Sequence, residues 1–185
     1  EGAREFAVRR EAARRAPETA EPPGEFRAEL MDFQKKGLAF LLSNRRCLLA
    51  DDMGLGKTVQ ALAFLCATQA YPALICAPPH LLTNWRREID RFLGPDIRVH
   101  VLRGLTPREL PEGEIYLTHY LLLRGWKEAL PKMGFRTVIF DEMQELRHAG
   151  TEKYSAASLV SSAAENVIGL SGTPIYNHGG EIWNV

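Results

Sequence analysis

The sequence predicts an α/β fold in which a mostly parallel central sheet carries helices on both faces. Short uninterrupted apolar runs, typical of strands buried on both sides, alternate with segments that have the apolar period of amphipathic helices. This alternation predicts parallel strands joined by helical crossovers, with ligands expected beyond the carboxyl ends of the strands. We expect strands at residues 46–50, 73–77, 115–118, 137–140 and 167–170, and helices at 32–42, 57–70, 81–92 and 152–164.

Length and composition limit the possible classes of protein. The 185 residues are enough for one compact domain and too few for two of full size. Hydrophobic residues make up 45% of the chain and charged residues 25%, which excludes wholesale disorder. Lys and Arg together number 23, as do Asp and Glu, so the net charge of +0 provides no general basic surface for nucleic acid. Any contact with a polyanion therefore depends on the local placement of a few residues.

The first part of the chain differs in composition from the rest. Residues 1–30 contain six Arg and seven Glu together with three Pro, a composition typical of a solvated helix followed by a linker. From residue 30 onward the apolar runs begin. We therefore divide the chain into a charged N-terminal extension and linker, residues 1–25, and one folded domain, residues 26–185.

Two features bear on the compartment. The longest uncharged stretch lies between Lys57 and Arg86, but Gln, Pro and His residues interrupt it, so we expect no membrane span. The three cysteines, Cys47, Cys66 and Cys76, form no Cys-x-x-Cys pair and lie in apolar runs. This is typical of buried structural thiols, and it predicts a reducing, intracellular location.

The most specific motif is a glycine-rich segment between an expected strand and an expected helix. Residues 51–58 read Asp-Asp-Met-Gly-Leu-Gly-Lys-Thr, in the context that a phosphate-binding loop requires. Glycines let successive backbone N–H groups turn toward phosphate oxygens, and the next helix adds the positive end of its dipole. Lys57 is expected to reach the β- and γ-phosphates of ATP, and Thr58 to ligate Mg²⁺. The residues expected to contact nucleotide here are Asp52, Met53, Gly54, Leu55, Gly56, Lys57 and Thr58.

The loop departs from the general pattern at one position, because Asp51 stands where Gly is usual. The alternative interpretation is a plain glycine-rich turn that binds no phosphate.

Two acids end another expected strand. In a parallel sheet Asp141 and the phosphate loop lie at the same edge, so Asp141 can hold the Mg²⁺ that Thr58 also contacts. Glu142 could orient and deprotonate the attacking water. Acids after a strand are also common as turn residues, and their combination with the phosphate loop favours the catalytic interpretation.

From about Phe26 to Val185 the chain resembles the first RecA-like lobe of the Swi/Snf-type branch of superfamily two helicase-like ATPases. The resembling motifs cover residues 30–42, 49–58, 76–89, 117–120, 141–144 and 170–183, in the family's order. This branch has an acid in its phosphate loop, so Asp51 supports the resemblance. The resemblance implies a RecA-like P-loop NTPase lobe that binds ATP and Mg²⁺. It implies that Gln34 reads adenine, and that Lys57, Asp141 and Glu142 serve catalysis.

The resemblance also implies contact with the backbone of duplex DNA, without sequence reading. Short polar side chains can hold phosphate oxygens without contacting base edges. The candidate DNA contacts are Thr83, Asn84, Thr118 and Arg147, and the residues expected to couple hydrolysis to DNA are Gln144, Ser171, Gly172 and Thr173. We expect Trp85 to be a packing anchor rather than a platform for stacked bases.

One motif deviates from the family. Residues 141–144 read Asp-Glu-Met-Gln, where the family usually has Asp-Glu-Ala/Gly-His. Gln144 keeps a hydrogen-bond donor and an acceptor but cannot titrate as His does. We therefore expect metal binding and water activation to be retained and the coupling step to change.

Three functions are compatible with these motifs. The first is a DNA-dependent ATPase that translocates on duplex DNA, the second an RNA-directed helicase of the same superfamily, and the third a nucleotide-binding scaffold without turnover. The acidic phosphate loop and the segment around Trp85 favour DNA over RNA. In the family a second RecA-like lobe supplies an arginine finger, and nothing in this sequence resembles that lobe. Because such a finger contributes about 10³–10⁵ in rate, we expect the chain alone to be a poor ATPase.

Overall fold

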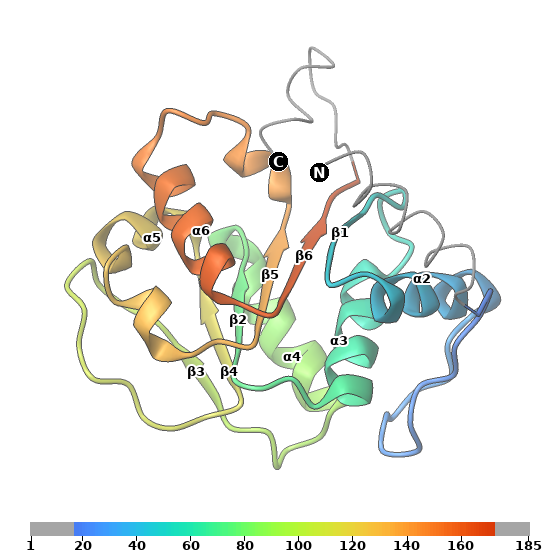
Figure 1. Ribbon diagram of the computed structural model, residues 1–185. Coiled ribbons are helices and arrows are strands. Elements are labelled where there is room, and N and C mark those ends of the chain that lie inside the picture. Colours follow the sequence, from blue (N-terminus) through green and yellow to red (C-terminus); the bar gives the residue numbers. More distant parts are fainter. Residues whose placement is uncertain (1–16, 173–185) are drawn as a thin grey trace.

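Six parallel strands form one central sheet in the computed structural model, which describes residues 17–172 (Figure 1). Their order across the sheet is β1-β6-β5-β2-β4-β3, and every neighbouring pair is parallel. The predicted α/β fold is therefore confirmed. The strands are β1 (Arg46–Leu49), β2 (Ala73–Cys76), β3 (Val99–Val101), β4 (Ile115–Thr118), β5 (Thr137–Asp141) and β6 (Asn166–Leu170).

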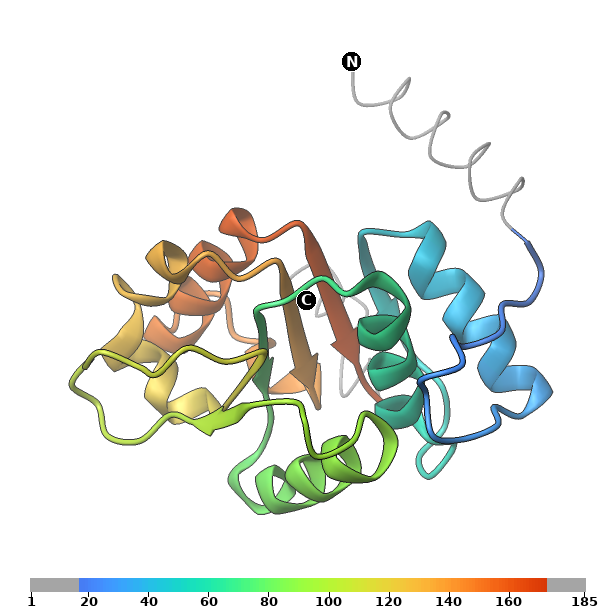
Figure 2. The same ribbon diagram turned by 90° about the horizontal axis from the view of Figure 1, so that it is seen from below.

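Helices cover both faces of this sheet. Figures 1 and 2 show α5 and α6 on one side, with α3 and α4 on the other. Helices lie in every connection between successive strands except that from β3 to β4, which is a loop, and each brings the chain back over the sheet, as expected of this class of fold. The helices are α2 (Asp32–Ser43), α3 (Lys57–Thr68), α4 (Leu82–Phe92), α5 (Tyr120–Trp126) and α6 (Glu152–Ala163), with short 3₁₀ turns at Pro79–Leu81, Leu130–Met133 and Met143–Leu146.

The alternation of side chains along the strands divides the core into two layers. Ile75 of β2 and Ile139 of β5 belong to the cluster that packs against α2, α3 and α4. Their neighbours Leu74 and Val138 point to the opposite face and pack with α5 and α6. All four side chains are fully buried, which explains why the strands have continuous apolar runs and not an alternating pattern.

Two elements were not predicted from the sequence. Strand β3 is only three residues long and lies at the edge of the sheet, so its apolar pattern is too short to recognise. Helix α5 follows β4 almost directly, and the two share one apolar stretch in which no Gly or Pro marks the boundary. The other elements lie within a few residues of the predicted ranges.

Part of the predicted linker packs on the domain. Phe26, the first residue of the predicted domain, stacks its ring on Phe92 at the end of α4, with centroids 5.8 Å apart. The Ala20 N–H donates to the Lys35 carbonyl at 3.1 Å, and the Lys35 ammonium pairs with Glu21 at 2.7 Å. Residues 17–25 therefore have contacts with α2. Residues 1–16 and 173–185, which include Thr173, lie outside the described residues.

Candidate active site

The phosphate loop lies between β1 and the first turn of α3. Gly54 and Gly56 have φ angles of +83° and +74°, in the left-handed region that glycine adopts without strain. Gly56 is the N-cap of α3, and no side chain caps this helix end. The first N–H groups of α3 therefore have no side-chain cap, and their binding of phosphate stays a prediction.

Lys57 lies over this loop with its ammonium directed toward the loop backbone. Its Nζ donates to the carbonyl oxygens of Asp51 at 2.7 Å and Asp52 at 2.9 Å. The side chain of Lys57 is half-buried, so the charge lies in the concavity of the loop. This is the position from which it can meet phosphate oxygens.

The acid at the unusual position of the loop has a structural partner. The Gln60 amide, from the first turns of α3, donates to Asp51 Oδ2 at 3.0 Å. Gln60 is fully buried, and a Cβ placed on Gly37 of α2 would lie only 1.6 Å from its Oε1. The close approach of α2 therefore requires Gly37, and Asp51 provides a hydrogen-bond acceptor for a buried amide.

Gln34 on α2 contacts the same loop. Its Oε1 accepts from the Met31 N–H at 3.0 Å, and its Nε2 donates to the Leu55 carbonyl at 3.2 Å. A Cβ on Gly56 would lie 2.6 Å from the Gln34 Nε2. The structure thus places Gln34 against the phosphate loop, and its reading of adenine stays a prediction.

Asp141 ends β5 with both carboxylate oxygens engaged. Oδ1 accepts from the Glu142 N–H at 3.0 Å, and Oδ2 accepts from the indole Nε1 of Trp85 at 2.8 Å. The backbone carbonyl of Asp141 accepts from the Tyr120 hydroxyl at 2.7 Å. Burial raises the pKa of Asp141 above its ordinary value, and the hydrogen bond from Trp85 opposes this rise. Lys57 lies close enough to lower the same pKa.

Glu142 is joined to the end of the neighbouring strand by a chain of two hydrogen bonds. Its backbone has a φ of +53°, an uncommon left-handed conformation for a residue other than glycine. Gln144 Nε2 donates to Glu142 Oε2 at 2.5 Å, and the Ser171 hydroxyl donates to Gln144 Oε1 at 2.8 Å. Gln144 therefore bridges the two motifs by using its amide as donor and acceptor at once.

The order of the strands brings these motifs together. The phosphate loop follows β1, Ser171 and Gly172 follow β6, and Asp141 ends β5, and these three strands are adjacent in the sheet. A Cβ on Gly172 would lie 2.6 Å from the Met53 side chain and 3.6 Å from Lys57 Nζ. The carboxyl edge of the sheet is thus one site built from three segments far apart in the sequence.

The predicted DNA contacts differ in their exposure. Thr83 and Asn84 are exposed on the first turn of α4. Arg147 is half-buried, and its guanidinium donates to the Gln144 carbonyl at 3.4 Å. Thr118 is fully buried, and its hydroxyl has no hydrogen-bond partner among the described residues, so its placement does not favour direct contact of this side chain with DNA.

A family comparison identifies the class of protein. The model of a family described as SNF2-related domain matches residues 33–185. The chain belongs to this SNF2-related family. The Swi/Snf-type resemblance predicted from the motifs is therefore confirmed.

Curated relatives of this SNF2-related domain are much longer than the chain. The putative ATP-dependent helicase/translocase YwqA of Bacillus subtilis is 35% identical over 193 residues, which cover 94% of this chain and 20% of the relative. The DNA excision repair protein ERCC-6-like of Bos taurus is 33% identical over 183 residues, covering 87% and 14%. The chromatin-remodeling ATPase INO80 of Arabidopsis thaliana is 30% identical over 189 residues, covering 89% and 12%. The chain spans a fifth or less of these relatives.

Solved structures show the same architecture. The Sulfolobus solfataricus SWI2/SNF2 ATPase core in complex with dsDNA matches with a TM-score of 0.78 and 28% identity, over 90% of this chain and 36% of that one. The ATPase core domain of the same organism matches with a TM-score of 0.74 and 29% identity, over 89% and 35%. The RecA-like fold predicted for the SNF2-related domain is thereby confirmed.

The donor set of this SNF2-related domain fits Mg²⁺. Thr58 on the first turn of α3 and Asp141 at the end of β5 offer a hydroxyl and a carboxylate. Within residues 17–172, no group of three or more His, Cys, Asp or Glu side chains could hold a metal ion by itself. Mg²⁺ suits such a sparse set, because it keeps several waters and takes one or two protein ligands together with phosphate oxygens.

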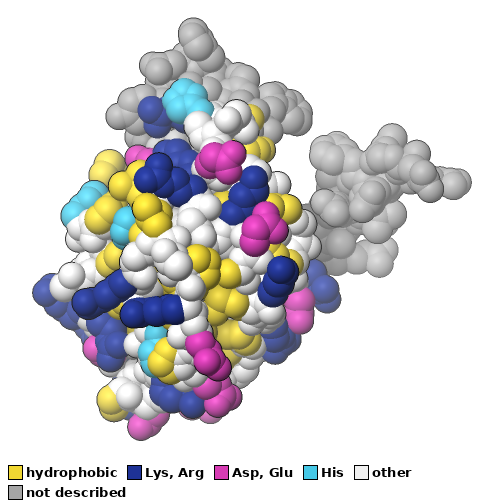
Figure 3. All heavy atoms as spheres, turned by 90° about the vertical axis from the view of Figure 1, so that its left-hand side faces the viewer, with side chains coloured by type: hydrophobic (Ala, Val, Ile, Leu, Met, Phe, Trp, Pro, Cys, Tyr) yellow, Lys and Arg dark blue, Asp and Glu magenta, His cyan; other side chains and the backbone are white. Residues whose placement is uncertain are grey.

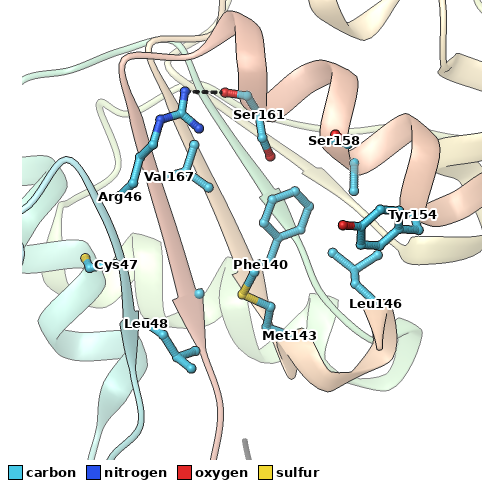
Figure 4. A pocket seen from close by; sticks show the side chains of 12 residues that line it. Arg46, Cys47, Leu48, Phe140, Met143, Leu146, Tyr154, Ser158, Ser161 and Val167 are labelled. Atoms are coloured by element: carbon cyan, nitrogen blue, oxygen red, sulfur yellow. Dashed lines mark hydrogen bonds between the residues drawn. The ribbon is translucent and has the colours of Figure 1, made fainter. Parts of the chain in front are cut away.

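A cavity on the other side of the sheet is separate from this edge. It has a volume of about 380 Å³ and lies between β1, β6 and α6 (Figure 4). Its lining includes Phe140, Met143, Tyr154 and Val167, and the Arg46 guanidinium at its rim donates to the Ser161 carbonyl at 2.8 Å. None of the phosphate-loop residues line it. This cavity is therefore separate from the phosphate loop.

Charge on the surface agrees with the neutral composition. Figure 3 shows Lys and Arg side chains spread among acidic and apolar ones on the side of the molecule that carries α5 and α6.

No helix among residues 17–172 is long and apolar enough to cross a membrane. The three cysteines are free thiols, and burial raises the pKa of Cys47 to about 11, which is consistent with a structural role.

Several residues of the site were not recognised in the sequence as parts of it. Trp85 was expected only to pack in the core, and neither Tyr120 nor Gln60 was singled out. Each lies on the buried face of a helix, where the sequence gives no signal of the partner of its polar group. Because a buried donor needs an acceptor, a buried polar side chain near a motif is a candidate for a hydrogen bond to that motif.

Proposed function

We propose that the chain is the ATP-binding lobe of a DNA-dependent ATPase that moves on duplex DNA. The observation that carries this proposal is the meeting of the phosphate loop, Asp141 with Glu142, and Ser171 at one edge of the sheet. An arrangement of this kind supplies an anion site, a metal ligand and a base within reach of each other.

Each group has a separate chemical role in the proposed hydrolysis. The N–H groups of the loop and of α3, together with the Lys57 ammonium, bind and orient the β- and γ-phosphates. Thr58 and Asp141 hold Mg²⁺, which when bound neutralises charge on the β- and γ-phosphate oxygens. The Glu142 carboxylate accepts a hydrogen bond from the attacking water and takes its proton as the oxygen approaches phosphorus.

Coupling follows from the bridge between Glu142 and Ser171. Because Gln144 bonds both side chains, a shift of the segment after β6 changes the position of the Glu142 carboxylate. We infer that Gln144, Ser171 and Gly172, with Thr173 beyond the described residues, transmit movement between the DNA and the phosphates.

DNA is the proposed track because a similar ATPase core was solved in complex with dsDNA. The exposed Thr83 and Asn84 on α4 are the contacts that we propose for its phosphates, with Arg147 as an additional positive charge. Contacts of this kind carry no sequence information, which suits a motor that moves along any sequence. An intracellular location follows from this function.

The proposed function requires a second RecA-like lobe for efficient turnover. In the family that lobe supplies the arginine finger, a group that contributes about 10³–10⁵ in rate in phosphoryl transfer. We therefore expect the 185-residue chain to bind Mg·ATP but to hydrolyse it very slowly. Robust DNA-stimulated turnover by this chain alone would contradict the requirement.

Two substitutions test the assignment, in the longest natural chain that contains this region. Lys57→Ala should abolish nucleotide binding and hydrolysis, because the loop loses its cation. Glu142→Gln should retain Mg·ATP binding while DNA-stimulated hydrolysis falls by at least about 10²-fold, the lower end for loss of a general base. Retained hydrolysis in both variants would refute the residue roles. Nucleotide binding without turnover in that longer chain, unsubstituted, would favour a scaffold. Stimulation of its hydrolysis by RNA in place of duplex DNA would favour an RNA-directed helicase.

A further inference from the structure

Trp85 is a buried tryptophan whose polar group points at the active site. Its side chain is 1% exposed, and its indole N–H donates to Asp141 Oδ2 at 2.8 Å. The residue comes from α4, 56 positions before the acid in the sequence. Packing alone does not need this N–H, because Phe, Leu or Ile could fill an apolar space without placing a donor in it.

The hydrogen bond determines which orientations the carboxylate can adopt. The Glu142 N–H occupies one lone pair of Oδ1 and the indole occupies one lone pair of Oδ2, and each oxygen keeps a second lone pair. Two donors on opposite oxygens hold the plane of the carboxylate in one rotation about its terminal bond. The free lone pairs then point in a fixed direction, away from the two donors.

Helix α4, which carries the indole, is held in place by packing in the core. Trp85, Ile89 and Phe92 of α4 are all buried in the core cluster shared with α3 and with the sheet. The indole therefore cannot follow Asp141 if the acid turns, so the acid adapts to the indole. A donor seated in this way orients a metal ligand in the manner of outer-sphere hydrogen-bond partners in metal sites.

We propose that Trp85 is a positioning residue, which holds the Asp141 carboxylate in the orientation that binds Mg²⁺. This inference rests on the proposed function, since it assigns Asp141 to the metal. It predicts that loss of the indole N–H weakens Mg²⁺ binding by about 10- to 100-fold, the usual effect of removing an outer-sphere partner, without weakening metal-free binding of nucleotide.

Two variants of the full chain isolate the N–H group. Trp85→Phe removes the donor and part of the ring. A second variant carries benzothienylalanine at position 85, in which sulfur replaces the N–H within an unchanged shape. Trp126→Phe is the matched control, because the Trp126 indole is equally buried and donates at 2.8 Å to the Gly104 carbonyl, away from Asp141.

The measurement is the Mg²⁺ concentration at half-maximal binding of a fluorescent ADP analogue, followed by anisotropy. Both position-85 variants should require about 10- to 100-fold more Mg²⁺, whereas Trp126→Phe should stay within about two-fold of the unsubstituted chain. If Trp85→Phe does not fold, as judged by circular dichroism, the benzothienylalanine variant decides. In combination with Asp141→Asn, the benzothienylalanine substitution should cause no additional loss, because its effect acts through that carboxylate.

Two results would overturn the proposal in different ways. An unchanged Mg²⁺ requirement in the benzothienylalanine variant would refute the positioning role and leave the proposed function intact. No Mg²⁺-dependent nucleotide binding in the unsubstituted chain would refute the proposed function and the inference with it.

Discussion

Gln144 should be the residue whose loss separates ATP binding from hydrolysis. Its amide links the Glu142 carboxylate at 2.5 Å and the Ser171 hydroxyl at 2.8 Å. Gln144→Leu keeps a similar volume but removes both hydrogen bonds. The Glu142 side chain, which is half-buried beside the end of β5, then loses the donor that orients it.

The size of the effect follows from the two bonds. A hydrogen bond to a charged group contributes about 1.5–3 kcal/mol net, and one between neutral groups about 0.5–1.5 kcal/mol. If the bond to Glu142 serves to position the base in the transition state, its loss lowers kcat by about 10- to 150-fold, at 1.36 kcal/mol for each factor of ten. The bond to Ser171 joins neutral groups and acts on the Glu142 carboxylate only through Gln144, so its loss alone should lower kcat by a smaller factor, about 2- to 12-fold.

The assay is DNA-stimulated ATP hydrolysis at saturating ATP, in the longest natural chain that contains this region, together with nucleotide affinity. We expect kcat to fall and the affinity to stay unchanged, because no atom of Gln144 contacts the phosphate loop in the described hydrogen bonds. Gln69→Leu provides a control, since the Gln69 amide donates to the Cys66 carbonyl at 2.7 Å at the far end of α3. A kcat within about three-fold of that of the unsubstituted protein would refute the reasoning, because a loss of this size is well below the loss calculated from the bond.

Gln144→His tests the direction in which hydrolysis changes with pH. Neutral His can donate with one ring nitrogen and accept with the other, but protonated His can only donate. Below its usual pKa of about 6.5, the variant therefore loses its acceptor for Ser171, and hydrolysis should fall as the pH drops through that value. A pH profile identical to that of the unsubstituted protein would show that the bridge does not contribute to turnover.

Two further predictions concern the stability of the domain. Asp51→Ala leaves the buried Gln60 amide without the acceptor that it has at 3.0 Å, so the free energy of unfolding in urea should fall by about 1–3 kcal/mol. Asp52→Ala, on the exposed part of the same loop, should change it by less than about 0.5 kcal/mol, and equal losses would contradict the role of the buried pair. The Arg98 side chain lowers the pKa of Glu114 through a hydrogen bond. A lowered folded-state pKa stabilises the protein above the usual Glu value of about 4.3, and the gain is lost as the pH falls through the folded value. Glu114→Gln should thus lower the melting temperature at pH 7 and not at about pH 2, and a loss independent of pH would refute this cause.

Much of the site follows from local sequence. The phosphate loop is recognisable because Gly54 and Gly56 adopt backbone angles that few other residues adopt, directly between an apolar run and a helix. The acids at 141 and 142 are recognisable because they end a continuous apolar strand. Properties of this kind depend on residues adjacent in the chain, so the periodicity and the motif are sufficient to predict them.

The sequence by itself therefore determined the parallel α/β class, the phosphate loop and the acids that end a strand. Only the tertiary structure decided that β6 lies between β1 and β5, which brings Ser171 beside Gln144, and that α4 is seated so that Trp85 reaches Asp141. These contacts join residues 27 and 56 positions apart. Hydrogen bonds require a donor and an acceptor at about 3 Å with the correct angle, and that geometry exists only after strand order and helix packing have been set.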